Sequence, residues 1–582
     1  AVMKLARLAL LPALAIGAYA LSSTPPKAVP KVAPGAKHGI DLTAIDPSIA
    51  PGDDFFRYAN GKWIARTEIP ADRGSWSNGA EMTERTAKRT EELITQASKE
   101  NAPAGSDARK IGDYYSTFMD EDAIEKKGLE PVKPALDAIA AVSNEAELAR
   151  ALGATVRADV DVLNNTNLET DNILGLWVAQ DLDDPSRYAA FLLQGGLFMP
   201  DRDYYLDPSP RMADLRTKYQ AHIATVLKLA GTADAEAKAT RIFELERRIA
   251  EAHASRTDSG DVEKGNNHWT REEFDTKAPG LDWRAFFAAA GLQGEKAFVV
   301  WQPTAITGIA ALAHSIPLST WKEYLAFHAI EHFSYVLSRA FVDERFEFHG
   351  KALTGTPKQR ERWKRGVTVT DNALGEAVGK LYVAKYFPAS EKSRAEAMVK
   401  NELAAFGKRI DALAWMAPAT KARAKAKLAV LKVFVGYPDK WRDLSGLQVV
   451  RGDAFGNEVR SEHFRLKVAL EKLGRPVDRT EWVMNPQLVN AVNLPAMNAL
   501  NFPAAILQPP NFDPSRPEVM DYGAAGMVIG HEISHSFDDQ GALFDAEGRL
   551  KNWWTKEDFA HFHESAEKLA KQYDGYHPFP DL

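Results

Sequence analysis

At 582 residues the chain is longer than a single hydrophobic core usually serves, so we expect more than one lobe. Hydrophobic residues make up 45% and charged residues 26%, as in an ordinary soluble globular protein, and the net charge of -7 argues against the basic field of a nucleic-acid-binding protein. The absence of cysteine excludes disulfides, thiolate metal ligands and a cysteine nucleophile.

The first twenty residues have the pattern of an export signal. Lys4 and Arg7 precede an apolar run over 8–16, and small residues flank Tyr19. A membrane anchor is the alternative, but the run is too short to span a bilayer comfortably. We therefore expect 1–20 to be a signal peptide and the mature protein to be exported, without stable membrane insertion.

Residues 21–40 are rich in Pro, Ala and Lys and predict an extended tether. From Asp41 to about 442 most segments have helical spacing, as in 81–100, and three runs are candidate strands: 172–182, 296–303 and 447–452. We expect a mainly helical domain over 41–442 and a connector over 443–480. A different segment, 481–582, would contain a strand and a helix.

Two histidine motifs could each bind zinc. The inverted pattern His-x-x-Glu-His occupies 328–332, inside a stretch, 319–341, that predicts one long helix. Its histidines share a helical stripe with Trp321 and Leu325, which favours a packed core with hydrogen-bonded histidines over a metal site.

The second motif, His531-Glu532-Ile533-Ser534-His535, has the spacing of a zinc-binding helix. Four residues are just over one helical turn, so His531 and His535 project side by side and can both bind one ion. Glu532 is rotated by about 100°, near the metal without ligating it, where a general base belongs.

The flanking residues are consistent with a zinc helix. The preceding stretch 522–530 is rich in small residues, which would let this helix approach another element closely. Ile529, Ile533 and Phe537 form an apolar stripe toward a core. Asp538 could orient a zinc ligand from behind, although acidic residues at a helix end are often simply solvated.

The segment VIGHEISHSFDDQG closely resembles the zinc helix of the neprilysin and endothelin-converting-enzyme family of metallopeptidases. Other segments match the family in the same order. They are PGDDFFRYANGKW (51–63), MPDRDYYL (199–206), LGEAVGKLYVAKYFP (374–388), VGYPDKWRD (435–443) and FPAAILQPPNF (502–512).

The resemblance implies a mainly α, two-lobed fold, with a large helical lobe and a thermolysin-like zinc lobe around a cavity. It implies an exported zinc endopeptidase acting on oligopeptides, with one Zn2+ per chain, that cuts on the amino side of hydrophobic residues. His531 and His535 would hold zinc while Glu532 takes a proton from the attacking water. The lack of cysteine suits a bacterial, periplasmic or secreted member.

The family also holds the substrate backbone with an Asn-Ala pair on an edge strand, and Asn490 and Ala491 match that pair. Asn493 stands where the family usually has tyrosine, and Ala499 stands where it has glutamate. An ordinary loop amide is the alternative for Asn490.

A catalytic zinc usually needs a third protein ligand. In the family this ligand is a glutamate further downstream, which we expect beyond Leu582, so the catalytic domain would be incomplete and the chain a fragment with weak zinc binding and little activity. If the protein ends at Leu582, it would instead be a non-catalytic peptide-binding or interaction protein. His561, His563 and His577 fit no family position and are expected at the surface.

Overall fold

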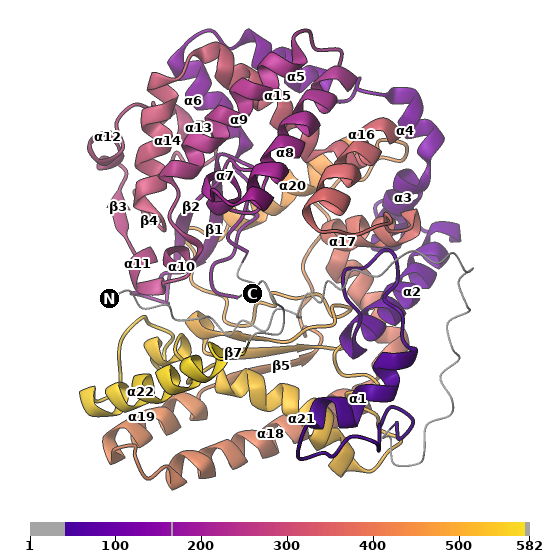
Figure 1. Cartoon of the computed structure of the whole chain (residues 1–582), viewed down its shortest axis with the longest axis vertical. Helices are drawn as coiled ribbons and strands as arrows, with labels where there is room; N and C mark the ends of the chain where they lie inside the picture. The colour runs from indigo at the N-terminus through magenta and orange to yellow at the C-terminus, as the bar shows by residue number, and fades with distance from the viewer. Residues whose placement is uncertain (1–40, 165–166, 577–582) are drawn as a thin grey trace.

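A computed structural model describes residues 41–164 and 167–576. The predicted signal peptide, the tether and His577 lie outside this range. The described chain is mainly helical, as predicted, and it forms an upper and a lower part in the orientation of Figure 1. None of the helices over these residues is both long and apolar enough to cross a membrane.

The upper part is a large helical assembly with one mixed sheet of order β1-β2-β4-β3 (Figure 1). Its strands are β1 (Leu174–Gln180), β2 (Tyr188–Gln194), β3 (His268–Thr270) and β4 (Ala297–Val300). Its helical elements are α3 (Asp107–Met119), α4 (Glu121–Lys127), α5 (Lys133–Ala141), α6 (Glu145–Thr155), α7 (Arg202–Leu206), α8 (Pro210–Leu229), α9 (Ala235–Ala252), α10 (Arg256–Ser259), α11 (Val262–Gly265), α12 (Phe274–Lys277), α13 (Trp283–Ala289), α14 (Pro303–Ser315), α15 (Leu318–His332), η1 (Ser334–Val336), α16 (Arg339–Arg345), the π-helical η2 (Phe346–Leu353) and α20 (Ala454–Leu470).

The lower part contains a three-stranded sheet of order β5-β7-β6, with β5 parallel and β6 antiparallel to β7. Its elements are α1 (Phe55–Arg66), α18 (Ala389–Ala412), α19 (Pro418–Ala429), β5 (Lys432–Gly436), β6 (Val492–Leu494), η3 (Pro495–Met497), β7 (Ala499–Pro503), α21 (Glu518–Ser534), η4 (Gly541–Leu543) and α22 (Lys556–Tyr573).

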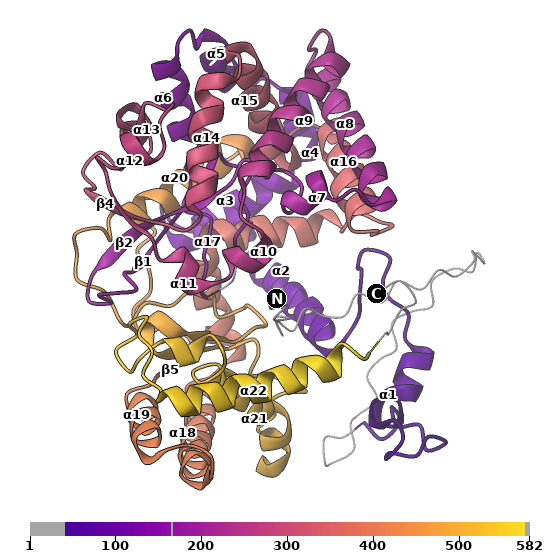
Figure 2. The same ribbon diagram turned by 60° about the vertical axis from the view of Figure 1, so that its left-hand side comes forward.

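Two long helices, α2 (Asn78–Lys99) and α17 (Arg362–Tyr386), lie between the two parts in both ribbon views (Figures 1 and 2). They pack on each other and on α3 through buried side chains such as Ile94, Ile111 and Val378. The same two helices also place Leu93 and Tyr382 in the buried cluster of the lower part, so they join the two parts.

The lower part draws on more of the chain than the predicted division assigned to it. Helices α18 and α19 and strand β5, all placed in the 41–442 domain by the sequence, lie in the lower part together with α21. Helix α20, in the predicted 443–480 connector, lies in the upper part (Figure 1). One buried cluster explains the first difference, because Met398 and Val435 pack in it with Phe502 and Ile529. These apolar side chains come from distant parts of the sequence and meet only because the elements that carry them pack together.

Two of the three predicted strands are confirmed, as β1 and β4. The third, at 447–452, is wrong. There the backbone N–H of Val450 donates to the side-chain oxygen of Asn457 at 2.8 Å, and its C=O accepts from the same side chain at 2.9 Å. A side chain of α20 thus satisfies the backbone groups that a neighbouring strand would otherwise pair.

The single helix predicted over 319–341 is also wrong, because α15 ends at His332 and α16 begins at Arg339. The buried Ser334 hydroxyl donates to the carbonyl of Glu331 at 2.9 Å, and Arg345 donates to the same carbonyl at 2.8 Å. Side chains that bond a helix carbonyl compete with the backbone and favour such an ending.

Candidate functional site

The His-Glu-x-x-His motif lies at the carboxyl end of α21, in the lower part. Glu518 and Asp521 lie in the first turn of this helix, where negative charge is favourable to the helix dipole. The small residues before the motif let α18 come close, as predicted. A Cβ atom added to Gly526 would lie 2.6 Å from Oε1 of Glu402, at the end of a side chain on α18, so Gly526 leaves room for that carboxyl group.

His531 and His535 lie side by side, with their Nε2 atoms 2.9 Å apart. His535 caps the helix with helical backbone angles, and its N–H donates to the carbonyl of His531 at 3.2 Å. Both rings are half-buried. Ile529 and Ile533 on the same helix are fully buried and hold it against the core, while Phe537 stacks on Phe406. Two imidazole nitrogens presented together in this way can share one metal ion.

Asp538 holds His535 from behind. Its Oδ2 lies 2.6 Å from Nδ1 of His535, while its Oδ1 accepts backbone N–H bonds from Gln540 at 3.1 Å and Gly541 at 2.8 Å. A carboxylate on Nδ1 selects the tautomer whose Nε2 lone pair is free for a metal. The neighbouring Asp539 is exposed, so of the two acidic residues only Asp538 has this geometry.

Glu532, which lies between the two histidines in the sequence, is buried, with 6% of its surface exposed. Burial raises the pKa of its carboxyl to about 7, in opposition to the lowering effect of His535. A cation on the adjacent histidines would favour the ionised form and lower this pKa. Glu532 is therefore a buried carboxyl group beside His531 and His535 whose affinity for a proton is raised by its surroundings.

Asn493, which stands where the resemblance leads us to expect tyrosine, connects β6 to α21. Its buried side-chain amide donates to the carbonyl of Glu532 at 3.0 Å and to Oγ of Ser536 at 2.7 Å. The Glu532 carbonyl lies in the last turn of α21, where helix carbonyls need partners from outside the helix. Asparagine at position 493 thus provides a contact that caps the carboxyl end of α21, and the sequence pattern did not reveal this contact.

Asn490 and Ala491 lie just before β6, which is at the edge of its sheet beside α21. Asn490 is exposed, and Ala491 is half-buried. An exposed amide at the end of an edge strand can bond the backbone of an extended peptide.

Lys427 on α19 is a residue that sequence reasoning missed. Its buried ammonium donates to the carbonyls of Ser536, Gly541 and Phe544 at 2.8, 2.7 and 2.7 Å. These carbonyls belong to the loop that carries Asp538, so Lys427 holds this loop, and with it Asp538, in place beside His535. Nothing in the local pattern of α19 distinguishes Lys427 from the lysines around it.

Over residues 41–164 and 167–576, no third histidine, aspartate or glutamate ligand atom lies within 4.8 Å of both His531 and His535. His561 stacks on Trp415 and His563 packs on the edge of Phe559, so neither joins the pair, in agreement with the sequence interpretation.

The histidines of the inverted motif are packed and hydrogen-bonded, as predicted. His328 bonds the backbone oxygen of Asp171 and Oε1 of Glu246, both at 2.9 Å. His332 bonds the carboxylates of Asp171 and Glu462. Glu331, between them in the motif, contacts a different set of side chains.

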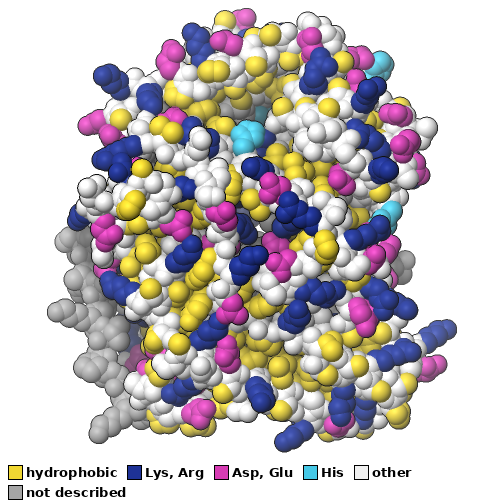
Figure 3. Space-filling view, turned by 180° about the vertical axis from the view of Figure 1, so that it is seen from behind, with side chains coloured by type: hydrophobic (Ala, Val, Ile, Leu, Met, Phe, Trp, Pro, Cys, Tyr) yellow, Lys and Arg dark blue, Asp and Glu magenta, His cyan; other side chains and the backbone are white. Residues whose placement is uncertain are grey.

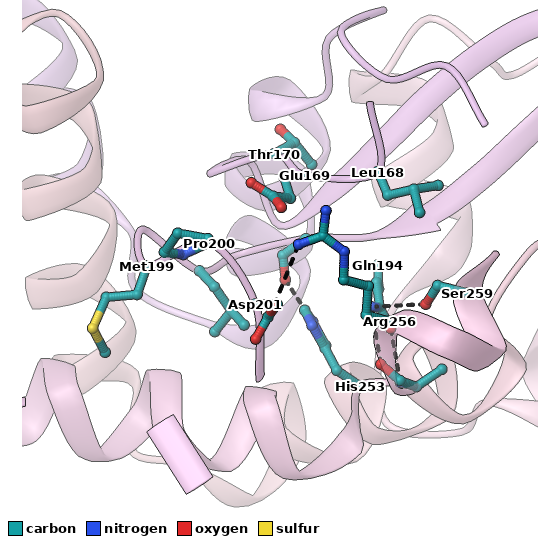
Figure 4. Close-up of a pocket in the computed structure, with 13 residues that line it drawn as sticks. Leu168, Glu169, Thr170, Gln194, Met199, Pro200, Asp201, His253, Arg256 and Ser259 are labelled. Atoms are coloured by element: carbon teal, nitrogen blue, oxygen red, sulfur yellow. Dashed lines mark hydrogen bonds and ion pairs between the residues drawn. The ribbon is translucent and has the colours of Figure 1, made fainter. Parts of the chain in front are cut away.

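A small pocket in the upper part lies between the MPDRDYYL segment and α10 (Figure 4). Its polar groups bond one another: Gln194 donates to the carbonyl of Ala254 at 3.3 Å and accepts from its N–H at 2.8 Å. Burial lowers the pKa of His253 to about 4, so this ring is neutral at neutral pH. Gln194 and Ala254 thus satisfy each other, and the ring of His253 bonds the carbonyl of Gly195 at 3.0 Å.

The face of the molecule in Figure 3 mixes acidic and basic side chains and has no continuous basic surface.

Comparisons with known proteins agree with the resemblance seen in the motifs. Two sequence models of peptidase family M13 match the chain, over 51–438 and 490–581. Endothelin-converting enzyme-like 1 of Mus musculus is 29% identical over 549 residues, covering 91% of this chain and 70% of that protein. Neprilysin-3 of Drosophila melanogaster is 28% identical, covering 92% and 70%.

Solved structures agree on the fold. The Mycobacterium tuberculosis zinc metalloprotease Zmp1, in complex with an inhibitor, superposes with a TM-score of 0.87 at 40% identity, covering 94% of this chain and 81% of that one. PepO from Lactobacillus rhamnosis superposes with a TM-score of 0.80 at 24% identity, covering 91% and 82%.

Proposed function

Because the chain belongs to peptidase family M13, a family of peptide-hydrolysing enzymes, we propose that it is a zinc-dependent endopeptidase acting on oligopeptides. The observation that carries this proposal is the arrangement at the end of α21. The Nε2 atoms of His531 and His535 lie 2.9 Å apart, and Asp538 is hydrogen-bonded behind His535.

The residues fit zinc. Two imidazoles with a carboxylate on the far nitrogen of one of them are typical zinc ligands. Zinc bound here supplies a Lewis acid that lowers the pKa of a bound water and polarises the peptide carbonyl. One Zn2+ per chain is proposed for this site.

Glu532 is the proposed general base. It takes the proton of the water that attacks the peptide carbonyl and can pass it to the leaving amine. Its burial supports this role, since a carboxyl group whose pKa is near neutrality can both accept and return a proton.

Asn490 and Ala491 are the proposed binding residues for the substrate backbone. A peptide lying beside β6 would exchange main-chain hydrogen bonds with the strand and a side-chain bond with Asn490. We propose cleavage on the amino side of hydrophobic residues, and export of the protein, directed by residues 1–20. N-terminal sequencing of the protein recovered from outside the cytoplasm tests the export proposal.

The test of function is hydrolysis of a peptide library by protein expressed from the complete gene, with and without a chelator. We expect cleavage that chelation abolishes and zinc restores, and the cleavage sites in the products give the side-chain preference. Peptide binding without hydrolysis in zinc-loaded protein would instead favour a non-catalytic peptide-binding protein.

A further inference from the structure

A second group of metal-ligand side chains lies in the upper part, away from α21. His222 on α8, Glu331 on α15 and His349 on η2 meet there, and their ligand atoms all lie within 4.8 Å of one another. Nε2 of His222 and Nε2 of His349 lie 3.5 and 3.2 Å from the same atom, Oε1 of Glu331. Glu331 and His222 are buried, whereas the side chain of His349 is 22% exposed, so the cluster lies one side chain below the surface.

Three of the four ligand atoms in this cluster lack hydrogen-bond partners, whereas Oε1 of Glu331 accepts from Arg345. Nε2 of His222, Nε2 of His349 and Oε2 of Glu331 are all buried and unpartnered. Each such atom costs free energy unless something satisfies it. Close contacts without hydrogen-bond geometry are expected when several donors are directed at a common point rather than at each other.

The spacing suits a small transition-metal ion. Zinc–nitrogen and zinc–oxygen bonds are about 2.0–2.1 Å, so two neighbouring ligand atoms of a tetrahedral site lie about 3.3 Å apart. The two distances to Glu331 Oε1, 3.2 and 3.5 Å, bracket that value. Two imidazoles and one carboxylate favour zinc over calcium or magnesium, which prefer oxygen ligands.

The surroundings orient His222 as a ligand. Its Nδ1 lies 2.9 Å from Oε1 of Glu344, and its ring stacks on Phe348 with a centroid distance of 5.1 Å. A carboxylate on one ring nitrogen leaves the lone pair of the other nitrogen, Nε2, for a metal. This is the relationship that Asp538 has with His535 at the other site.

The local charge also favours a cation. The carboxylates of Glu331 and Glu344 face one nearby guanidinium, that of Arg345, which donates to Oε1 of Glu331 at 2.9 Å. With both histidines neutral, one negative charge is in excess. The Arg345 side chain is 31% exposed and is therefore partly screened by water, and its bond leaves Oε2 of Glu331 available.

His349 lies in a π-helix, a rare conformation that is frequent at functional sites. We propose that His222, Glu331 and His349 bind a second zinc ion, which holds α8, α15 and η2 together. The inverted motif contributes only its glutamate to this site, because His328 and His332 are bonded to other carboxylates.

The experiment uses the full chain with the α21 site removed by His531→Ala and His535→Ala. After chelation and reloading, the zinc content is measured by elemental analysis, and Co2+ is followed by its visible absorption. We expect about one zinc ion per chain, an absorption band typical of a four-coordinate nitrogen–oxygen site, and a Tm raised by a few degrees in zinc.

Adding His349→Ala should lower the zinc affinity at least about tenfold and remove the Tm shift. His314→Ala, at an exposed histidine, is the matched control and should change neither. If the His531→Ala, His535→Ala chain binds no zinc, the proposal is overturned, and the cluster then holds only a proton on His222 shared between Glu331 and Glu344. The result does not depend on hydrolysis, so it is independent of the function proposed for α21.

Discussion

The imidazole of His535 and the carboxylate of Asp538 are joined by a bond of 2.6 Å between Nδ1 and Oδ2, and the same carboxylate is itself fixed by two backbone N–H groups. The histidine ring is therefore held in one orientation, with Nε2 beside that of His531. A ligand that is oriented in advance loses less conformational freedom when it binds a metal.

Replacing Asp538 tests this orientation. Asp538→Asn should weaken zinc binding about 10–100-fold, because the amide no longer offers a charged acceptor to Nδ1. The measurement is competition for zinc with a chelator of known affinity. Asp539→Asn, at the exposed neighbour, is the control, and an equal loss in both variants would mean that net charge, not orientation, sets the affinity.

Glu532 can be tested without disturbing the metal. Glu532→Gln should lower peptide hydrolysis about 10²–10⁴-fold while zinc binding is retained, since the amide cannot accept the proton of the attacking water. Rates and zinc content are measured on the same protein, expressed from the complete gene. Glu518→Gln, at an exposed residue in the first turn of α21, should leave both unchanged. Hydrolysis that survives Glu532→Gln removes this residue from the mechanism.

Lys427 should matter for stability. Lys427→Met leaves three buried carbonyls without their donor, and we expect a loss of about 3–5 kcal/mol in the free energy of unfolding. Urea unfolding followed by circular dichroism measures it. Lys425→Met, two residues earlier at an exposed ion pair with Asp411, should cost less than about 1 kcal/mol. Similar losses in the two variants would show that the three bonds contribute little.

The buried carboxyl group of Glu458 should make the free energy of unfolding depend on pH. Burial raises the pKa of its carboxyl to about 7, although Tyr114 and Tyr335 donate to it. Between about pH 4.5 and 7 the folded state then binds more protons than the unfolded state, so stability falls as the pH rises through that range. The contribution of this group is about 3 kcal/mol.

The check is Glu458→Gln, which keeps the shape of the protonated acid but does not titrate. Urea unfolding at pH 5 and pH 8 should show a smaller difference between the two pH values in this variant than in the parent chain. Glu471→Gln, at an exposed residue next to the end of α20, should behave like the parent. An unchanged difference in Glu458→Gln would place the pH dependence on another group.

The sequence alone was enough to predict the fold class and the side-by-side placement of His531 and His535 on one helix. Helical spacing places His531 and His535 on one side of one turn whatever surrounds them, and the small residues before them are visible as a pattern. Ordered motif matches predicted the mainly helical fold and the family, which the comparisons confirmed. Zinc binding by His531 and His535 and the roles of Glu532, Asp538, Asn490 and Ala491 remain predictions.

Other features depend on residues far apart in the chain. Lys427 meets carbonyls more than a hundred positions later, and Asn493 caps a helix 39 positions away. Glu331 lies in one motif with His328 and His332, yet its closest side chains include His222 and His349. Local periodicity describes only what falls within a few helical turns. The partners of a buried charge or amide are set by which elements pack together, so only the tertiary structure decided them.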